Sequence, residues 1–262
     1  ITSNVDLTIA GNGPGNTIID GADAHRPFLS EWANNMALTL SDLTIRNGRA
    51  EEENGGAIEI LGDASSVLTI KRVEFVGNTA GYEGGAIRTS IPTHIEDSVF
   101  ENNEGRTFGG AITANSAPLT VLNSSFTGNS APFSIIQFSG DIAPAVNGRL
   151  VNVTVTGNPS QHSTIQVVLN ARLSLSNTVV AGNPSGDSLN MRSGGQVDAA
   201  TSFNNLIGPA GDPGLVDGVN GNQLDVVDPL IGLLGNYGGP TRTLPLLPGS
   251  PAIDAGTHTG GD

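Results

Sequence analysis

Cysteine is absent from the 262-residue chain, and lysine occurs once, at Lys71. Without cysteine there is no disulfide, no thiolate metal ligand and no cysteine nucleophile. No run of about 18 apolar residues occurs, so the sequence predicts no membrane-spanning helix and no direct membrane insertion. The 11 basic and 25 acidic residues give a formal net charge of −14, which opposes binding to nucleic-acid phosphates and to anionic lipid.

Helix-forming residues and aromatic residues are also scarce. Aromatics make up 4% of the chain, whereas glycine occurs 36 times, and Asn, Ser, Thr and Asp alternate with Val, Ile, Leu and Phe. This composition is typical of many short strands joined by turns. All the glutamates lie between Glu31 and Glu104, and every later acid is Asp, which is a turn residue as much as a charge.

Two tetrapeptides recur and interleave along the chain. Gly-Gly-Ala-Ile begins at Gly55, Gly84 and Gly109, with spacings of 29 and 25 residues. Phe-x-x-Asn follows the same rhythm, with spacings of 25 and 26, and begins at Phe75, Phe100 and Phe126. A fixed period of this length is the signature of a repeat architecture.

Each repeat reads as three short strands, which cannot bury an apolar face alone but can do so when successive units stack. We therefore expect an all-β fold, a parallel β-helix of about eight or nine coils with strands spaced about 4.8 Å apart. The helix should be right-handed, because parallel crossovers have that hand by strong preference. A β-sandwich, the rival fold, does not explain the fixed period.

Stacking places equivalent residues of successive repeats in columns. Phe75, Phe100 and Phe126 should form one buried column. A structural ladder of stacked side-chain amides is expected from the recurring asparagines, Asn78, Asn103, Asn129, Asn158 and Asn183. Asparagine also tolerates the left-handed backbone conformation that a tight turn needs.

The chain changes character near residue 204. Residues 1–203 are expected to form the β-helix, and residues 204–262, rich in Gly, Pro and Asp, an irregular C-terminal cap. Prolines within residues 228–256 cannot donate to a β-ladder, so this segment should fold back across the C-terminal end or flank of the rod. A turn at residues 248–251 would bring Ile253 inward, and Leu244, Leu246 and Leu247 should be buried with it.

Charged residues gather in the loops that precede the Gly-Gly-Ala-Ile strands. They define a candidate glycan-binding face made of Glu51, Glu52, Glu53, Glu83, Arg88, Glu104 and Arg106. Scattered carboxylates require convergent geometry before they can act in catalysis, so no catalytic residue is assigned.

Metal ligands lack a clear pattern in the sequence. The four histidines are far apart in the repeat order and show no ligand spacing. Ca²⁺ is the one cofactor considered, through oxygen ligands from the cap aspartates Asp212, Asp217, Asp225 and Asp228, although no EF-hand loop or nonapeptide calcium repeat is present. No other cofactor or metal is expected.

The chain resembles two groups of bacterial β-helix proteins. The interleaved Gly-Gly-Ala-Ile and Phe-x-x-Asn tetrapeptides resemble the passenger repeats of chlamydial polymorphic outer-membrane proteins. The segment 228–256, D-P-L-I-G-L-L-G-N-Y-G-G-P-T-R-T-L-P-L-L-P-G-S-P-A-I-D-A-G, is similar to the closing segment of right-handed β-helix proteins grouped as choice-of-anchor proteins, in the pectin-lyase-like superfamily. Together the resemblances cover residues 5–256 or so.

These resemblances imply a secreted or surface-attached protein. The first hypothesis is a non-catalytic extracellular scaffold, an adhesin or a filament-forming module, with self-association or a surface glycan or protein as partner. The alternative is a polysaccharide lyase or glycoside hydrolase acting on a surface groove, since many β-helix proteins cleave acidic polysaccharides with carboxylates near an Arg or Lys. Because the chain starts at Ile1 without Met, we expect it to be one processed or trimmed part of a longer surface protein.

Overall fold

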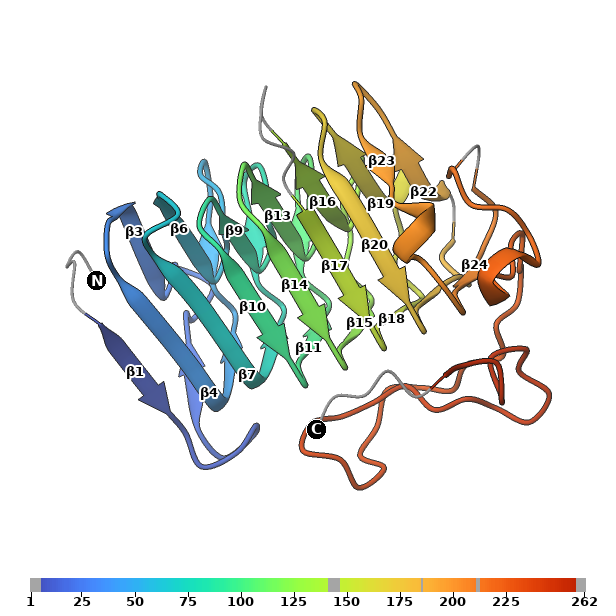
Figure 1. Ribbon diagram of the computed structural model, residues 1–262. Helices are drawn as coiled ribbons and strands as arrows, with labels where there is room; N and C mark the ends of the chain where they lie inside the picture. Colours follow the sequence, from blue (N-terminus) through green and yellow to red (C-terminus); the bar gives the residue numbers. More distant parts are fainter. Residues whose placement is uncertain (1–5, 141–146, 185, 211–212, 258–262) are drawn as a thin grey trace.

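Strands one repeat apart pair in parallel, so the chain winds into a rod of stacked coils (Figure 1). The computed structural model describes residues 6–140, 147–184, 186–210 and 213–257. All pairings between its strands are parallel, and helix is limited to two short 3₁₀ turns, η1 (Ala199–Thr201) and η2 (Val219–Gly221). The parallel β-helix expected from the repeats is confirmed.

A 14-stranded sheet forms two faces of the rod. The first face contains β1 (Leu7–Ala10), β4 (Ala37–Arg46), β7 (Val67–Val76), β10 (Thr93–Glu96), β14 (Leu119–Leu122), β17 (Asn147–Val151), β20 (Arg172–Ser176) and β23 (Gln196–Val197). The second face contains β2 (Ile18–Asp20), β11 (Val99–Glu101), β15 (Ser125–Thr127), β18 (Thr154–Val155), β21 (Val179–Val180) and β24 (Leu206–Ile207). The long strands β4 and β7 bend and take part in both faces.

Two further sheets complete the coil. The third face is a seven-stranded sheet of β3 (Phe28–Ala33), β6 (Ile58–Gly62), β9 (Ile87–Thr89), β13 (Ile112–Asn115), β16 (Ile136–Ser139), β19 (Ser163–Val168) and β22 (Asp187–Met191). The narrow sheet contains β5 (Arg49–Ala50), β8 (Thr79–Ala80) and β12 (Glu104–Gly105) and lies between the second and third faces in the chain order.

The seven strands of the third face correspond to seven complete turns, fewer than the eight or nine expected. The difference lies at the two ends. Strands β1 and β2 pair directly with β4 before the chain reaches the third face, so they make only part of a turn. At the other end β24 pairs with β21, so the coil continues past residue 203 as another partial turn.

The interior is a continuous apolar core in which equivalent side chains lie one above another. The rings of Phe75, Phe100 and Phe126 are stacked, with centroids 4.8 and 4.5 Å apart, and all three are fully buried. The column of phenylalanines predicted from the spacing is confirmed. Ile58, Ile87 and Ile112 are paired in register on the third face and are likewise buried.

The five repeat asparagines lie inside the corner that follows the second face. Each side-chain amide donates to the side-chain oxygen of the next: Asn78 to Asn103 at 2.9 Å, Asn103 to Asn129 at 2.8 Å, Asn129 to Asn158 at 2.9 Å and Asn158 to Asn183 at 3.1 Å. In the last partial turn, Asn205 donates to Asn222 in the same way, at 2.8 Å. Each oxygen also accepts a backbone N–H, as Asn129 does from Asn103 at 3.1 Å.

The left-handed residue of this corner is not the ladder asparagine, as the sequence had suggested. It is the residue before it, and φ is positive at Gly77, Asn102, Gly128, Gly157 and Gly182. The preceding residue turns the chain, which leaves the asparagine free to direct its amide into the core.

A second column lies outside the rod, at the corner between the first and second faces. Its members all have positive φ: Asp42, Arg72, Asp97, Asn123, Asn152, Asn177 and Asn204. The Arg72 guanidinium donates to both Asp42 oxygens, at 2.6 and 2.8 Å. These hydrogen bonds lower the pKa of the Asp42 carboxyl and raise that of Arg72.

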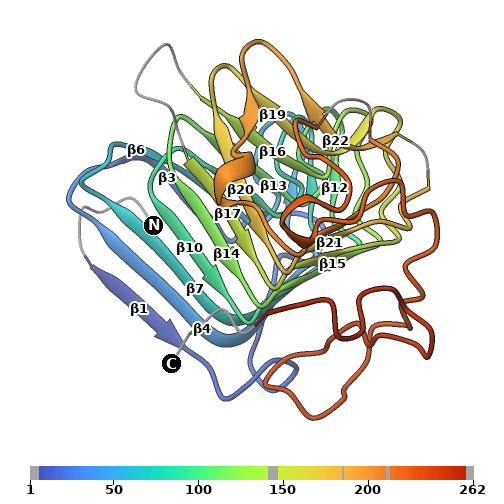
Figure 2. The same ribbon diagram turned by 45° about the vertical axis from the view of Figure 1, so that its right-hand side comes forward.

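At the C-terminal end, Ala210, Leu215 and Leu224 pack against the core. The tail after residue 228 runs back along the flank of the rod instead (Figures 1 and 2). Antiparallel bridges at Ile231–Leu246 and Gly235–Thr243 fold it into a hairpin-like segment.

Near its tip the tail reaches the N-terminal half of the coil. The Thr241 hydroxyl donates to the Asp97 carbonyl at 2.9 Å, and Arg242 donates to Glu74 and Glu101 of adjacent turns at 2.8 and 2.7 Å. Burial acts to lower the pKa of Arg242, but the hydrogen bonds to the two glutamates outweigh it, and the pKa is raised.

The apolar side chains of the tail are more exposed than the sequence had suggested. Leu246, Leu247 and Ile253 keep 41–44% of their surface exposed, and Leu244 is half-buried. The expectation that Ile253 turns inward is wrong, because Ala210, Leu215 and Leu224 already pack against that end of the core. Ser250 is the buried residue of that turn, and its hydroxyl donates to the Pro229 carbonyl at 2.6 Å.

Candidate functional site

The narrow sheet and its continuation form a shallow trough along one side of the rod. Successive turns contribute two-residue strands, with Ala50 paired to Ala80 and Ala80 to Gly105. Isolated bridges continue the column from Ala131 to Ser160. Because these central residues are small, the flanking side chains enclose two hollows.

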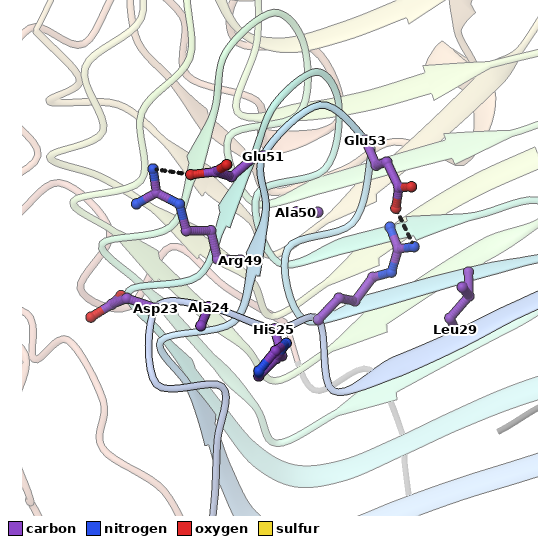
Figure 3. Close-up of a pocket in the computed structure, with 9 residues that line it drawn as sticks. Asp23, Ala24, His25, Leu29, Arg49, Ala50, Glu51 and Glu53 are labelled. Atoms are coloured by element: carbon purple, nitrogen blue, oxygen red, sulfur yellow. Dashed lines mark hydrogen bonds and ion pairs between the residues drawn. The ribbon is translucent and has the colours of Figure 1, made fainter.

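The first hollow, of about 640 Å³, lies against the first turns. Figure 3 shows Arg49 and Glu51 together on one side of it, Glu53 and Leu29 on the other, and His25 between them. Arg49 pairs with Glu51 at 3.1 Å. Arg26 also lines this hollow and pairs with Glu53 at 2.6 Å. Two of its carboxylates are thus neutralised by arginines.

A buried ion-pair network lies next to this hollow, on the outer side of the third face. Glu59, on β6, accepts from Arg26 at 2.8 Å and from Arg88 at 3.1 Å. Arg88 also pairs with Glu83 at 3.5 Å. The side chains of Arg26 and Glu59 are 8% and 9% exposed, so this network is largely shielded from water.

Arg26 and Glu59 were missed by the sequence analysis. Glu59 was recognisable in principle, because it directly follows the first Gly-Gly-Ala-Ile, as Arg88 follows the second. These two residues are paired in register, and the column continues through Thr113, Gln137 and Gln166. The position directly after each Gly-Gly-Ala-Ile tetrapeptide thus carries the signal, and the loops before it do not.

The second hollow, of about 580 Å³, spans later turns of the same trough. Glu104 and Arg106 flank Gly105 at one side, and Pro132 and Gln161 lie on the next turns. No described residue forms an ion pair with the side chain of Glu104 or Arg106. This hollow therefore offers a carboxylate, a guanidinium and an amide for contacts outside the chain.

Aromatic rings stack beside the second hollow. Phe108 and Phe133 have centroids 4.7 Å apart, and His162 lies 5.0 Å from Phe133 and nearly parallel to it. The three rings come from equivalent loops of successive turns, which precede β13, β16 and β19. The sequence analysis did not predict this column, although its members lie 25 and 29 residues apart.

The seven residues of the predicted glycan face are distributed along this side of the rod. Glu51 and Glu53 line the first hollow, Glu104 and Arg106 line the second, Glu83 and Arg88 belong to the ion-pair network, and Glu52 is exposed in the loop after β5. They share one side of the molecule but not one cavity.

The cap aspartates act as turn residues. Asp217 accepts from the Leu224 N–H and Asp228 from the Leu230 N–H, each at 2.9 Å. Asp225 has a positive φ, and Asp212 lies outside the described residues. Within the described part of the chain, no three His, Asp or Glu side chains gather in a way that could hold a metal ion.

Comparison with known proteins gives one match. Residues 72–90 match the Chlamydia polymorphic membrane protein repeat family. This stretch contains one Phe-x-x-Asn and one Gly-Gly-Ala-Ile tetrapeptide, and it extends from the outer corner through the asparagine ladder to β9. No curated protein and no solved structure matches the chain.

The protein is thus a parallel β-helix with at least one repeat of a kind found in Chlamydia polymorphic membrane proteins. None of the helices in the described ranges is long and apolar enough to span a membrane. Similarity to pectin-lyase-like proteins and to choice-of-anchor tails remains a resemblance of sequence.

Proposed function

We propose that the protein is a non-catalytic module displayed at the cell surface, which binds a glycan or protein partner along the trough. One observation carries this proposal: three of the five carboxylates on the predicted face, Glu51, Glu53 and Glu83, are held in arginine ion pairs. A general acid or base must exchange protons freely with the substrate, and paired carboxylates are poorly suited to that task. The repeat match to a membrane-protein family supports the surface location.

The experiment measures binding and turnover on the same samples. The protein is incubated with a panel of neutral and acidic extracellular polysaccharides, and bound ligand is quantified alongside new reducing ends and unsaturated ends. We expect binding without product. Product from any polysaccharide would overturn the non-catalytic role, and absence of binding to all of them would overturn the glycan-binding one.

The surface location has its own test. Intact cells that produce the protein are treated with a protease that cannot enter them, and loss of the β-helix is followed by immunoblot. We expect loss from intact cells. Protection in intact cells but loss after lysis would contradict display at the surface.

Self-association is a separate part of the proposal. The covered C-terminal end and the exposed first turn differ in character, so contacts between copies would be head-to-tail or between sides of the rod. Light scattering over a range of concentrations should show species larger than the monomer. A monomer at every concentration would exclude the filament-forming version.

A second candidate function rests on the second hollow, where neither Glu104 nor Arg106 forms an ion pair with any residue that the structure describes. A carboxylate near a guanidinium is an arrangement that glycan-cleaving enzymes use. If the protein is a lyase or hydrolase, Glu104→Gln should abolish turnover while leaving binding. Turnover that persists in this variant would exclude Glu104 as the catalytic group.

A further inference from the structure

Free arginines are rare in this protein. Seven of the 11 basic residues pair with carboxylates: Arg26, Arg46, Arg49, Lys71, Arg72, Arg88 and Arg242. The four without such a pair among the described residues are Arg106, Arg149, Arg172 and Arg192. Acids outnumber bases more than two to one, so an unpaired arginine cannot be attributed to a shortage of carboxylates.

Two of the unpaired arginines line the same hollow on the first face, far along the chain from the predicted glycan face. Arg149 lies on β17 and Arg172 on β20, the neighbouring strand (Figure 1). In the register, Arg149 pairs with Ser174 and Arg172 pairs with Asn147, so the two arginines are diagonal neighbours. Diagonal neighbours on adjacent strands lie within reach of each other when their side chains are long.

Both arginines face outward, because the residues that alternate with them are buried. Leu150 on β17 and Leu173 and Leu175 on β20 are fully buried in the core, and both arginines are exposed. The hollow between them has a volume of about 340 Å³. Ligand sites fall in the range of roughly 300–1,000 Å³, so it is large enough for a small group such as one sugar ring.

Apart from Pro118, Gly148 and Leu173, the other residues of the lining are polar, and one of them is an acid. Thr120, Asn147 and Ser174 line the hollow, and their side chains make no hydrogen bond with any described residue. Asp198 is the acid at its margin, and its Oδ1 accepts the Ala200 N–H at 3.1 Å. The site therefore has two cations, hydroxyl and amide groups, and one carboxylate that already caps η1.

We infer that this hollow binds the carboxylate of an acidic sugar within an otherwise neutral oligosaccharide. Arginine has a planar fork that matches a carboxylate with two parallel hydrogen bonds. Threonine, serine and asparagine can bond the sugar hydroxyls. The choice of a sugar as the ligand rests on the proposed glycan-binding role. Binding of a carboxylate by the two arginines does not depend on that role.

Charge and backbone pairing argue against two other classes of ligand. A net charge of −14 repels an extended polyanion, which would carry negative charge past the arginines onto the acidic surface. A peptide that binds by strand addition needs an open sheet edge, but β17 is paired on both sides, to β14 and β20. An isolated acid flanked by neutral sugars satisfies both constraints.

The test uses matched oligosaccharides that end in a neutral hexose, a hexuronic acid or a sialic acid. Their binding to the full chain is measured by calorimetry and by NMR titration at low salt. We expect both acidic compounds to bind about ten-fold or more tightly than the neutral one, as charge-assisted hydrogen bonds require. The stronger of the two acids identifies the type of sugar.

Variants assign the binding to this hollow. Arg149→Ala and Arg172→Ala should each weaken binding of the acidic compound by about ten-fold. Arg149→Lys keeps the positive charge but lacks the planar guanidinium fork. Its affinity for the acidic compound should therefore lie between that of Arg149→Ala and that of the unmodified chain. Asp198→Asn should strengthen binding, because it removes a negative charge and retains an oxygen for the Ala200 N–H. Arg46→Ala is the control, since it removes the same charge from an exposed pair in the first turns and should change nothing.

The outcomes separate this inference from the proposed function. If the neutral compound binds as well as the acidic ones, or if the double variant Arg149→Ala/Arg172→Ala binds like the unmodified chain, the inference is wrong and glycan binding elsewhere still stands. If only free glucuronate binds, and the double variant loses it, the arginine site stands and the oligosaccharide is the wrong class of ligand. Folding of each variant is checked by its circular dichroism and melting temperature.

Discussion

The outward columns of the β-helix differ between its N-terminal and C-terminal halves. At the outer corner, Asp42 is bonded by Arg72 of the next turn at 2.6 Å, whereas Asn152 donates to Asn123 at 2.9 Å and Asn177 to Asn152 at 3.1 Å. The same backbone position thus holds an ion pair in early turns and an amide pair in later ones.

The third face repeats this contrast. Glu59 accepts from Arg88 at 3.1 Å in the early turns, and Gln137 donates to Gln166 at 3.2 Å in the later ones. The confinement of glutamate to the part of the chain that ends at Glu104 thus has a structural counterpart. Both halves share the interior stack, so we conclude that the interior sets the coil and that the outer columns set its response to pH and salt.

The largest expected effect tests the shared interior. Phe100→Ala removes the central ring of the buried stack and should lower the free energy of unfolding by about 3–5 kcal/mol. Phe108→Ala, in the partly exposed outer stack, is the matched control and should cost clearly less. Urea denaturation measures both. A loss below about 1 kcal/mol for Phe100→Ala would mean that the interior does not set the coil.

The next effect compares equivalent positions of the third face. Glu59→Ala removes the acceptor that Arg26 and Arg88 share and leaves them only the more exposed Glu53 and Glu83, so it should cost up to about 3 kcal/mol. Gln137→Ala removes a neutral hydrogen bond at the same position of a later turn and should cost about 1 kcal/mol. Equal losses in urea denaturation would contradict the distinction between the two halves.

The two asparagine columns differ in burial and should differ in energy. Asn129→Ala leaves the Asn103 amide without its acceptor in the core, and an unsatisfied buried group costs about 1–3 kcal/mol. Asn152→Ala, on the exposed outer column, should stay within about 0.5 kcal/mol of the unmodified chain. Urea denaturation of both variants measures the two losses. An equal loss of unfolding free energy for Asn152→Ala and Asn129→Ala would contradict the expected difference between the columns.

The sequence was sufficient for the fold because a repeat encodes its own register. The spacing of Phe75, Phe100 and Phe126 places them one turn apart, and local strand patterns then define the faces. Two contacts that the sequence does not reveal join residues with no shared period. Arg242 reaches Glu74 across 168 positions, and Arg26 reaches Glu59 from a loop outside the repeats. Ile253 was misplaced for the same reason, since nothing in the tail shows that Ala210, Leu215 and Leu224 already pack against that end of the core.

The smallest expected effect is the response to acid. Hydrogen bonds from Arg72 and Lys71 lower the pKa of Asp42 and Glu96 in the folded chain. A carboxyl with a lowered folded pKa stabilises the fold above its unfolded pKa, near 4, and this contribution is lost as pH falls through the folded value. The side chains of the later turns, Asn123, Asn152 and Asn177, do not titrate. The stability of those turns should therefore not change as the pH falls.

Native-state hydrogen exchange between pH 7 and about 3, corrected for intrinsic rates, resolves the two halves. Protection should fall more in β4, β7 and β10 than in β14, β17 and β20. The effect should be modest, because these ion pairs are partly exposed and contribute little. Asp42→Asn provides the control: it removes one titrating group and should reduce the pH dependence of β4 and β7 alone. A uniform loss of protection along the rod would show that the outer columns do not set the response to pH.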